Sequence, residues 1–358
     1  MTAFRVSFSL GDHKMNKIVL HAHDLDGYLL DKDKKNIDNI ARLYEKSLDA
    51  CRKIEKGEDA EDELIESARE IGNGLEAICK ENSRIHVYCF DTPNEMHGEA
   101  SRLIAKLRDP NTGHEEFLYY IQRAYELMFA HTFDTGKKRS LVQITPVTNP
   151  CRNYAVHRIP DIDEAAANSV LCVMLRGALL PSMIIAKELQ EYSSGDITPP
   201  FALFKIKRDE SKKETNMDYI LDLDRSFFKL KELDGKDLIF ADPMNATGGS
   251  LVTIVKYLKD NGIKPKSIKF INVISALKGA LRITRAIENA EVYTLWMDPV
   301  LNESAYILPG LGDAGDRLNG VDVGPEPRNM IQLIADYGTT IVNLYRDQVK
   351  EIEKTVLG

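Results

Sequence analysis

Several features that mark large protein classes are missing from this sequence of 358 residues. Cysteine is scarce, and no Cys-x-x-Cys pair occurs among Cys51, Cys79, Cys89, Cys151 and Cys172. We therefore expect neither a disulfide framework nor a zinc site, and we predict a cytoplasmic location. No apolar run approaches the roughly 20 residues that span a bilayer. The first residues also lack the basic and apolar regions of a secretory signal, so no membrane partner is expected.

An excess of positive charge is also missing. The chain carries 55 acidic and 47 basic residues, which gives a formal net charge of −8 at pH 7. This charge argues against a polyanionic partner, so no nucleic-acid partner is expected. A small phosphorylated ligand is still compatible with it, because helix N-terminal amides and one or two arginines can bind a phosphate locally.

The composition that is present, 43% apolar and 28% charged, is typical of a globular protein. Residues 1–88 are predicted to form a mostly helical N-terminal extension that begins with a short strand at 17–21. Two amphipathic helices follow, separated by a charged linker that contains Gly57, and each has apolar residues three and four positions apart. These residues are Ile37, Ile40, Leu43, Leu48, Cys51 and Ile54 in the first helix, and Leu64, Ala68, Ile71, Leu75 and Ile78 in the second.

Residues 89–320 show an α/β pattern. A helix is predicted at about 115–129 and a strand at 141–145. Uninterrupted apolar strands then alternate with helices, at 170–175, 237–241, 268–274 and 291–296. Such strands are typical of a parallel sheet covered on both faces, so we predict a doubly wound α/β core. Residues 321–358 are predicted to form a third segment, an amphipathic C-terminal helix with an apolar side made of Met330, Leu333, Ile334, Tyr337, Ile341, Leu344 and Val349.

The segment after the strand at 237–241 has the features of a phosphate-binding loop. It reads Asp242-Pro243-Met244-Asn245-Ala246-Thr247-Gly248-Gly249-Ser250 and opens a helix. Its glycines allow close approach of the backbone to a phosphate, which the amides at the helix start would bind. The acid at its start is placed to engage ribose hydroxyls or a bound cation. It matches neither a Walker A sequence nor Gly-x-Gly-x-x-Gly, and the alternative is a plain strand–turn–helix junction with a Thr or Ser cap.

A second loop, Tyr306-Ile307-Leu-Pro-Gly310-Leu-Gly312-Asp313-Ala314-Gly315-Asp316-Arg317, is rich in glycine and acids. Because each peptide unit supplies one donor and one acceptor, such a loop can recognise a flat base through its backbone. A surface Ω-loop is the alternative interpretation.

The two loops together resemble those of uracil phosphoribosyltransferases, a type I phosphoribosyltransferase family. Residues 242–250 are similar to the family's Asp-Pro-Met-x-Ala-Thr-Gly-Gly-Ser loop, and residues 301–315 are similar to its uracil loop. Weaker similarity extends back to Thr92-Pro93 with His97, Leu107-Arg108-Asp109 and Ala124-Tyr125-Glu126. The resemblance covers about residues 90–320.

The resemblance implies a type I phosphoribosyltransferase-like fold that converts uracil and PRPP (5-phosphoribosyl-1-diphosphate) to UMP and diphosphate in pyrimidine salvage. Mg²⁺ would accompany PRPP without direct protein ligands, and the chain would form a homodimer or a higher homo-oligomer. Arg176 would bind the diphosphate, Arg208 would contact PRPP from a mobile loop, and residues 242–250 would hold the ribose and the 5′-phosphate. Tyr306, Ile307, Gly312 and Ala314 would contact uracil, and Asp313 would contact both substrates. The catalytic residues would be Asp242, Arg176 and Asp313.

The sequence departs from the family pattern at several positions. Arg176-Gly177-Ala178 replaces Arg-Ala-Gly, Asn245 replaces an apolar residue, and Ser275-Ala-Leu-Lys278-Gly279 replaces Ala-Pro-Glu-Gly. The chain also continues beyond Asn319-Gly320, where the family usually ends. Two alternatives therefore stay open: a phosphoribosyltransferase for another nucleobase, and a regulatory protein that binds PRPP or uracil without turnover.

One further motif, His21-Ala-His23-Asp24-Leu-Asp26-Gly27, follows the first strand. It resembles fragments of metal-dependent hydrolase and phosphatase sites. Because the more distant ligands of such sites do not fit into the N-terminal segment, we interpret it as a polar exit from the strand.

Overall fold

The computed structural model describes residues 16–134, 136–147, 151–319 and 346–357. Its centre is a nine-stranded sheet with the order β1-β7-β6-β5-β8-β10-β11-β2, in which β9 (Met244–Asn245) pairs with β10. The strands of this order are β1 (Lys17–His21), β2 (Ile85–Val87), β5 (Ser169–Leu175), β6 (Phe201–Arg208), β7 (Asp218–Phe227), β8 (Asp237–Ala241), β10 (Ser267–Ala276) and β11 (Ala290–Asp298).

The strands from β6 to β2 in this order run parallel to one another. At the other edge, β7 runs antiparallel to β6, and β1 pairs antiparallel with β7. The chain adds β6 on one side of β5 and then β8, β10 and β11 on the other side. The prediction of a doubly wound sheet is confirmed, and the strand order reverses between β5 and β8. Ligands of such folds bind at the carboxyl ends of the strands beside this reversal.

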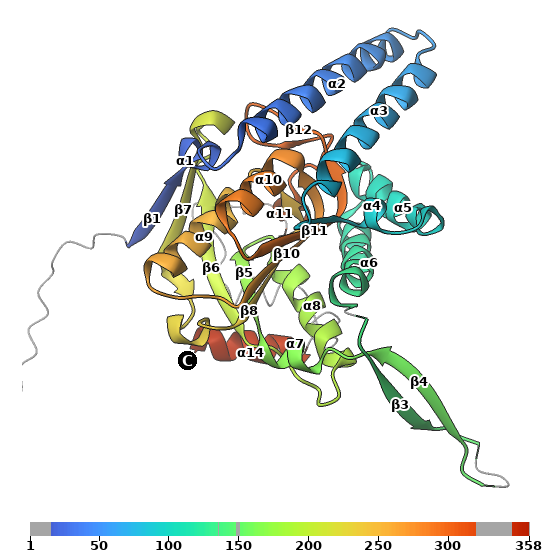
Figure 1. Ribbon diagram of the computed structural model, residues 1–358, viewed down its shortest axis with the longest axis vertical. Helices are drawn as coiled ribbons and strands as arrows, with labels where there is room; N and C mark the ends of the chain where they lie inside the picture. The colour runs from blue at the N-terminus through green and yellow to red at the C-terminus, as the bar shows by residue number, and fades with distance from the viewer. Residues whose placement is uncertain (1–15, 135, 148–150, 320–345, 358) are drawn as a thin grey trace, which may run out of the picture.

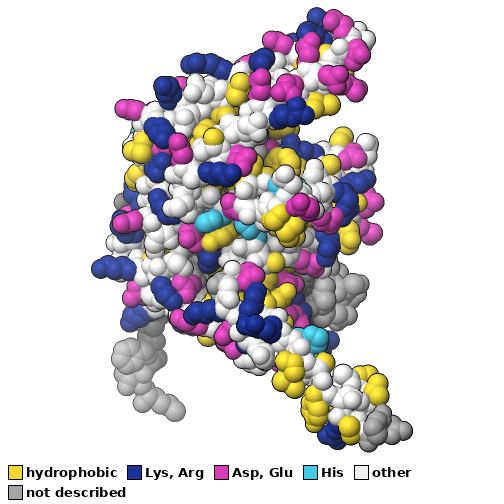
Figure 2. All heavy atoms as spheres, turned by 45° about the vertical axis from the view of Figure 1, so that its right-hand side comes forward, with side chains coloured by type: hydrophobic (Ala, Val, Ile, Leu, Met, Phe, Trp, Pro, Cys, Tyr) yellow, Lys and Arg dark blue, Asp and Glu magenta, His cyan; other side chains and the backbone are white. Residues whose placement is uncertain are grey.

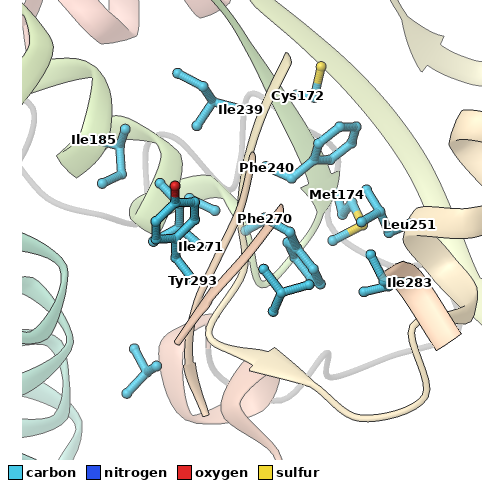
Figure 3. Close-up of a cluster of buried hydrophobic side chains, with 14 of the residues drawn as sticks. Cys172, Met174, Ile185, Ile239, Phe240, Leu251, Phe270, Ile271, Ile283 and Tyr293 are labelled. Carbon is cyan, nitrogen blue, oxygen red and sulfur yellow. The ribbon is translucent and has the colours of Figure 1, made fainter. Parts of the chain in front are cut away.

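Helices cover both faces of the sheet (Figure 1). The helices α6 (His114–Phe133) and α8 (Leu179–Tyr192) pack on one face, and α9 (Gly249–Asp260) and α10 (Leu277–Ala286) pack on the other. Alternate residues of β8 and β10 therefore point to opposite layers. In Figure 3, Phe240 and Phe270 lie towards Leu251 and Ile283, whereas Ile239 and Ile271 lie on the side of Ile185.

The N-terminal segment forms the predicted pair of amphipathic helices. After β1 and α1 (Ala22–Asp26), helices α2 (Asp31–Glu55) and α3 (Glu61–Lys80) form an antiparallel hairpin that projects from the top of the molecule in Figure 1. Strands β1 and β2 lie at opposite edges of the central sheet. The N-terminal segment thus supplies both edge strands, and its division from the rest at residue 88 stays a prediction.

A two-stranded antiparallel ribbon projects from the opposite end (Figure 1). It consists of β3 (Lys138–Ile144), which contains most of the predicted strand 141–145, and β4 (Tyr154–Pro160), which was not predicted. The C-terminal helix is described only as α14 (Arg346–Leu357), where Val349 is buried against the core. The other apolar residues predicted for that helix lie outside the described residues.

The remaining elements are short connections between these layers. They are α4 (Tyr88–Asp91), α5 (His97–Arg108), α7 (Asp163–Asn168), α11 (Ala314–Asn319), β12 (Val300–Leu301), β13 (Ile307–Leu308) and the 3₁₀ turns η1 (Asn94–Met96), η2 (Glu214–Asn216) and η3 (Leu230–Glu232). Over the part of the chain that the structure describes, no helix has the length and apolar character required to cross a membrane.

Candidate active site

A cavity of about 730 Å³ opens at the carboxyl ends of β5 and β8, beside the reversal of strand order. Four segments supply most of its lining, namely the residues around the end of β5, the end of β6, the loop from β8 to α9, and the start of α11, and β7 and β10 add further residues. The lining residues include Met174, Arg176, Gly177, Lys207, Arg208, Asp209, Glu210, Tyr219, Phe270, Asp313, Ala314, Gly315 and every residue from 242 to 250.

The predicted phosphate loop has a backbone that only glycine accommodates at two positions. Gly248 has φ +74°, and a Cβ atom there would lie 2.9 Å from the carbonyl oxygen of Gly279. Gly249 begins helix α9, and a Cβ atom on it would lie 2.2 Å from the ring of Tyr219. The close packing therefore leaves the first amides of a twelve-residue helix at the wall of the cavity. These amides have no carbonyl partners within the helix and favour an anion.

Asp242 stands at the start of this loop, directly after β8. Its Oδ1 accepts a hydrogen bond from the Met244 amide at 3.1 Å. Burial raises the pKa of Asp242 to about 7, and this single hydrogen bond lowers it only in part. A carboxylate whose pKa is raised by burial is stabilised in its charged form by a nearby cation or by hydrogen-bond donors.

Arg176 follows β5 directly and reaches across the cavity. Its Nη2 donates to Asp316 Oδ1 at 2.8 Å, and a cis peptide bond joins it to Leu175. Behind it, the Gly177 position packs close to the Gly315 Cα, which a Cβ atom on Gly177 would contact at 3.7 Å. The Arg-Gly-Ala segment therefore abuts the start of α11, and it connects the two predicted loops.

Arg208 is the last residue of β6, so the expectation that it lies within a loop is wrong for this residue. Pairing of β6 with β5 and β7 places it at the rim of the sheet. Its Nη1 donates to the Ala305 carbonyl at 3.1 Å, and its guanidinium lies 4.7 Å from the ring centre of Tyr306. The following residues, Asp209 and Glu210, also line the cavity.

The predicted base loop is anchored by a buried carboxylate, that of Asp298. The Gly310 amide donates to Asp298 Oδ2 at 2.9 Å, and Arg108 pairs with the same carboxylate at 2.5 Å. Burial raises the pKa of Asp298, which Arg108 opposes. Arg317 donates to the carbonyls of Leu107, Leu311, Asp109 and Thr112 and so fastens the loop to the end of α5.

The structure thus brings together most of the predicted site residues. Arg176, Arg208, residues 242–250, Asp313 and Ala314 line one cavity. Tyr306, Ile307 and Gly312 do not line it: Tyr306 lies behind Arg208, Ile307 is buried in β13, and Gly312 is exposed. The roles of all these residues stay predictions.

Sequence reasoning missed the contribution of Lys207, Asp209, Glu210 and Tyr219 to the cavity. The acids could have been found, since they directly follow Arg208 in the sequence. Tyr219 could not, because its contact with Gly249 depends on the pairing of β7 with β6.

Both predicted loops lie within the part of the chain that is similar to a known protein family. The model of the family "Uracil phosphoribosyltransferase" matches residues 95–320. The chain belongs to the uracil phosphoribosyltransferase family. A uracil phosphoribosyltransferase of Campylobacter curvus is 32% identical over 217 residues, which are 60% of this chain and 91% of the relative. One of Campylobacter fetus is 34% identical over 214 residues, or 59% of this chain and 89% of the relative.

Among solved structures, that of an Aquifex aeolicus protein covers 64% of this chain and 97% of its own, with 24% identity and a TM-score of 0.46. The predicted resemblance to uracil phosphoribosyltransferases over about residues 90–320 is confirmed by the family match. The ribbon lies within the matched region, and the N-terminal segment, residues 1–88, lies outside it.

Proposed function

We propose that the protein is a uracil phosphoribosyltransferase, which converts uracil and PRPP to UMP and diphosphate. The observation that carries the proposal is the shared cavity of the phosphate loop, Asp242 and Arg176, at the strand reversal of a chain from this family. Sequence similarity to relatives named for this activity extends over about 60% of the chain.

PRPP would lie along the cavity from the start of α9 to Arg176. The amides of residues 248–250, with the hydroxyls of Thr247 and Ser250, would bind the 5′-phosphate. Asp242 would accept hydrogen bonds from the ribose hydroxyls, and Arg176 and Arg208 would neutralise the diphosphate. Both arginines stand on strand ends that the parallel sheet fixes, so they would bind PRPP with little reorganisation.

Mg²⁺ would enter as part of the substrate complex. The cavity offers carboxylate oxygens from Asp242, Asp209 and Asp313, which are donors that Mg²⁺ prefers. Within the described ranges, no group of three or more His, Cys, Asp or Glu side chains is arranged to hold a metal ion. The donor set therefore fits a cation that takes most of its ligands from PRPP and water. When bound, it would withdraw charge from the departing diphosphate.

Uracil would lie between the loop after β13 and the ribose. The base would be read by the backbone of Ile307, Gly312 and Ala314, with Tyr306 beside Arg208 and Asp313 facing PRPP. In the reaction, the bond between C1′ and the diphosphate oxygen breaks, and diphosphate leaves with the electron pair of that bond. A ring nitrogen of uracil forms the new bond to C1′. The proton of that nitrogen is released. The protein would position the two substrates and stabilise the oxocarbenium-like charge.

The test is formation of UMP from radiolabelled uracil, PRPP and Mg²⁺, with Asp242→Asn as the loss-of-function variant. Asp260→Asn is the matched control, since Asp260 is exposed at the far end of α9. We expect the first substitution to lower kcat/KM at least about 100-fold and the second to leave it unchanged. No UMP from uracil but product from another base would favour the alternative substrate. Binding of PRPP and uracil without turnover would favour a regulatory protein.

We also propose that the protein acts in cytoplasmic pyrimidine salvage as a homodimer or higher homo-oligomer. The division into an extension at 1–88, a catalytic segment at 89–320 and a C-terminal segment at 321–358 belongs to the same proposal. The projecting ribbon supports association, because its exposed side chains include Val142, Ile144, Val147, Tyr154 and Val156.

A further inference from the structure

Helix α10 presents three cations on one side. Lys278, Arg282 and Arg285 are four and three positions apart, so they share a helix face. The N-terminal segment covers this face with acids. Asp26, at the end of α1, lies 2.7 Å from Arg282 and 3.7 Å from Lys278, and Asp33 in α2 pairs with Arg285 through two hydrogen bonds of 2.8 and 2.9 Å.

Arg282 is fully buried, and its guanidinium joins three separate segments. Its Nε and Nη2 donate to Asp26 Oδ1 at 3.1 and 2.7 Å. The same Nη2 lies 2.9 Å from Glu214 Oε1, and Nη1 donates to the Thr247 carbonyl at 3.4 Å. One side chain therefore connects the N-terminal segment, the loop after β6 and the phosphate loop.

The Thr247 carbonyl matters because it shares a peptide unit with the amide of Gly248. In a trans peptide the carbonyl and the N–H point in opposite directions. When Arg282 holds the carbonyl on the α10 side of the loop, the Gly248 N–H is directed away from α10. Gly248 lines the cavity, and α10 packs so closely on the loop that a Cβ atom on Gly279 would lie 2.5 Å from the Ala246 carbonyl. Arg282 thus fixes the direction of an amide at the wall of the cavity.

Glu214 is the second anion on Arg282, and it belongs to the loop between β6 and β7. Lys278 also donates a hydrogen bond to Glu214 at 3.0 Å, and the Glu214 side chain is almost entirely buried. The first residues of the same loop, Asp209 and Glu210, line the cavity. Without Asp26, Glu214 would have to balance both Lys278 and Arg282, and the guanidinium would turn from the phosphate loop towards it.

We propose that Asp26 is a positioning residue for PRPP, which acts through Arg282 on the phosphate loop. The N-terminal segment would then be part of the substrate site although it lies outside the matched family region. This assigns a purpose to the last acid of the His-x-His-Asp-x-Asp motif. The inference rests on the proposed use of PRPP.

Asp33 provides a matched control within the same interface. It ties the same N-terminal segment to the same helix and is 2% exposed. Among the residues that the structure describes, its partner Arg285 makes no hydrogen bond or ion pair with residues 242–250. Asp33→Ala also removes the acceptor of the Leu30 amide. The Asp26 side chain is 37% exposed, whereas Asp33 is buried. Asp33→Ala should therefore destabilise the chain at least as much as Asp26→Ala.

The experiment compares the full-length wild type with Asp26→Ala, Asp26→Glu and Asp33→Ala. The dissociation constant of PRPP with Mg²⁺ is measured by calorimetry, and KM is measured for each substrate. We expect Asp26→Ala to weaken PRPP binding and raise its KM about tenfold, the effect of roughly one charge-assisted hydrogen bond. The KM for uracil should stay within about twofold, Asp26→Glu should restore much of the affinity, and Asp33→Ala should lower only the unfolding temperature.

An unchanged PRPP affinity in Asp26→Ala would overturn the inference, as would equal losses in Asp26→Ala and Asp33→Ala. These outcomes differ from failure of the proposed function. Wild type that binds PRPP but makes no UMP would contradict the proposed function alone, and the binding comparison would still decide the role of Asp26. Wild type that does not bind PRPP would contradict both.

Discussion

At the scale of single residues, the site is organised around a carboxylate whose environment opposes its charge. Asp242 follows a buried strand, and burial raises its pKa to about 7. The folded chain therefore holds the proton more tightly than the unfolded chain, in which an aspartate titrates near 4. The cost of ionisation is absent at pH values below about 4 and grows as the pH rises towards and through 7.

Asp242→Asn should accordingly stabilise the protein at pH 8 while it abolishes activity. The expected gain in the free energy of unfolding is about 1–2 kcal/mol, which is less than the full shift implies because the carboxylate is partly exposed. The measurement is urea unfolding at pH 8 and at pH 4, where the gain should nearly vanish. A variant less stable than wild type at pH 8 would contradict the raised pKa, and Asp260→Asn serves as the reference.

The same titration predicts the pH dependence of substrate binding. If PRPP and Mg²⁺ bind the ionised form of Asp242, the KM for PRPP should rise as the pH falls below about 7. The slope should approach about tenfold per pH unit below that value. PRPP itself takes up protons in this range. The pH dependence of PRPP binding is therefore measured by calorimetry for both the wild type and Asp242→Asn, and the two profiles are compared. A wild-type profile that parallels the variant would assign the dependence to the substrate.

At the scale of elements, one departure from the family pattern ties the phosphate loop to a neighbouring strand. Asn245 in the phosphate loop donates to Ser275 Oγ at 2.9 Å, where β9 pairs with the end of β10. Both side chains are buried. The loop is thus tied to the neighbouring strand by a hydrogen bond that an apolar residue at position 245 would not form.

A double-mutant cycle should reveal this pair. Ser275→Ala leaves the buried Asn245 amide without its partner and should cost about 1–3 kcal/mol of the free energy of unfolding. Asn245→Ala should cost a similar amount, and the double variant should cost less than the sum by about 1 kcal/mol. Urea unfolding of the four proteins measures the coupling. Additive losses would show that the two side chains act independently.

Strands β5, β8, β10 and β11 could be predicted from the sequence, as could the edge strand β1, whereas β2, β6 and β7 were not predicted. Strands β5 and β8 are almost continuous apolar runs, because helices cover both faces of the sheet around them. Strand β7 carries charged residues and pairs with β6 and β1 near the edge, so it shows no clear apolar pattern. The phosphate loop could be predicted because its residues are contiguous in the sequence. The contact of Arg282 with Thr247 could not be predicted, because it joins residues that only the packing of α10 brings together.

At the scale of the whole molecule, two projections extend from the compact α/β body. The tip of the α2–α3 hairpin carries many charged side chains, whereas the β3–β4 ribbon shows clustered hydrophobic side chains (Figure 2). Charged tips are compatible with solvent, but an exposed apolar ribbon favours burial against another surface. The ribbon is therefore the better candidate for the contact between copies of the chain than the hairpin.

This difference yields a prediction about assembly. The wild type should have a mass in solution that is a multiple of the chain mass of 40.3 kDa. Val142 and Val156 are paired across the ribbon and are 58% and 64% exposed, so Val142→Asp with Val156→Asp should leave the fold intact. Because two carboxylates buried in the interface would oppose association, we expect light scattering to report the mass of a single chain for this double variant.

The control is Ile65→Asp on α3 of the hairpin, where Ile65 is 55% exposed. This substitution should leave the assembly unchanged. Dissociation by Ile65→Asp alone would move the interface to the N-terminal helices, and a wild type with the mass of one chain would refute the homo-oligomer.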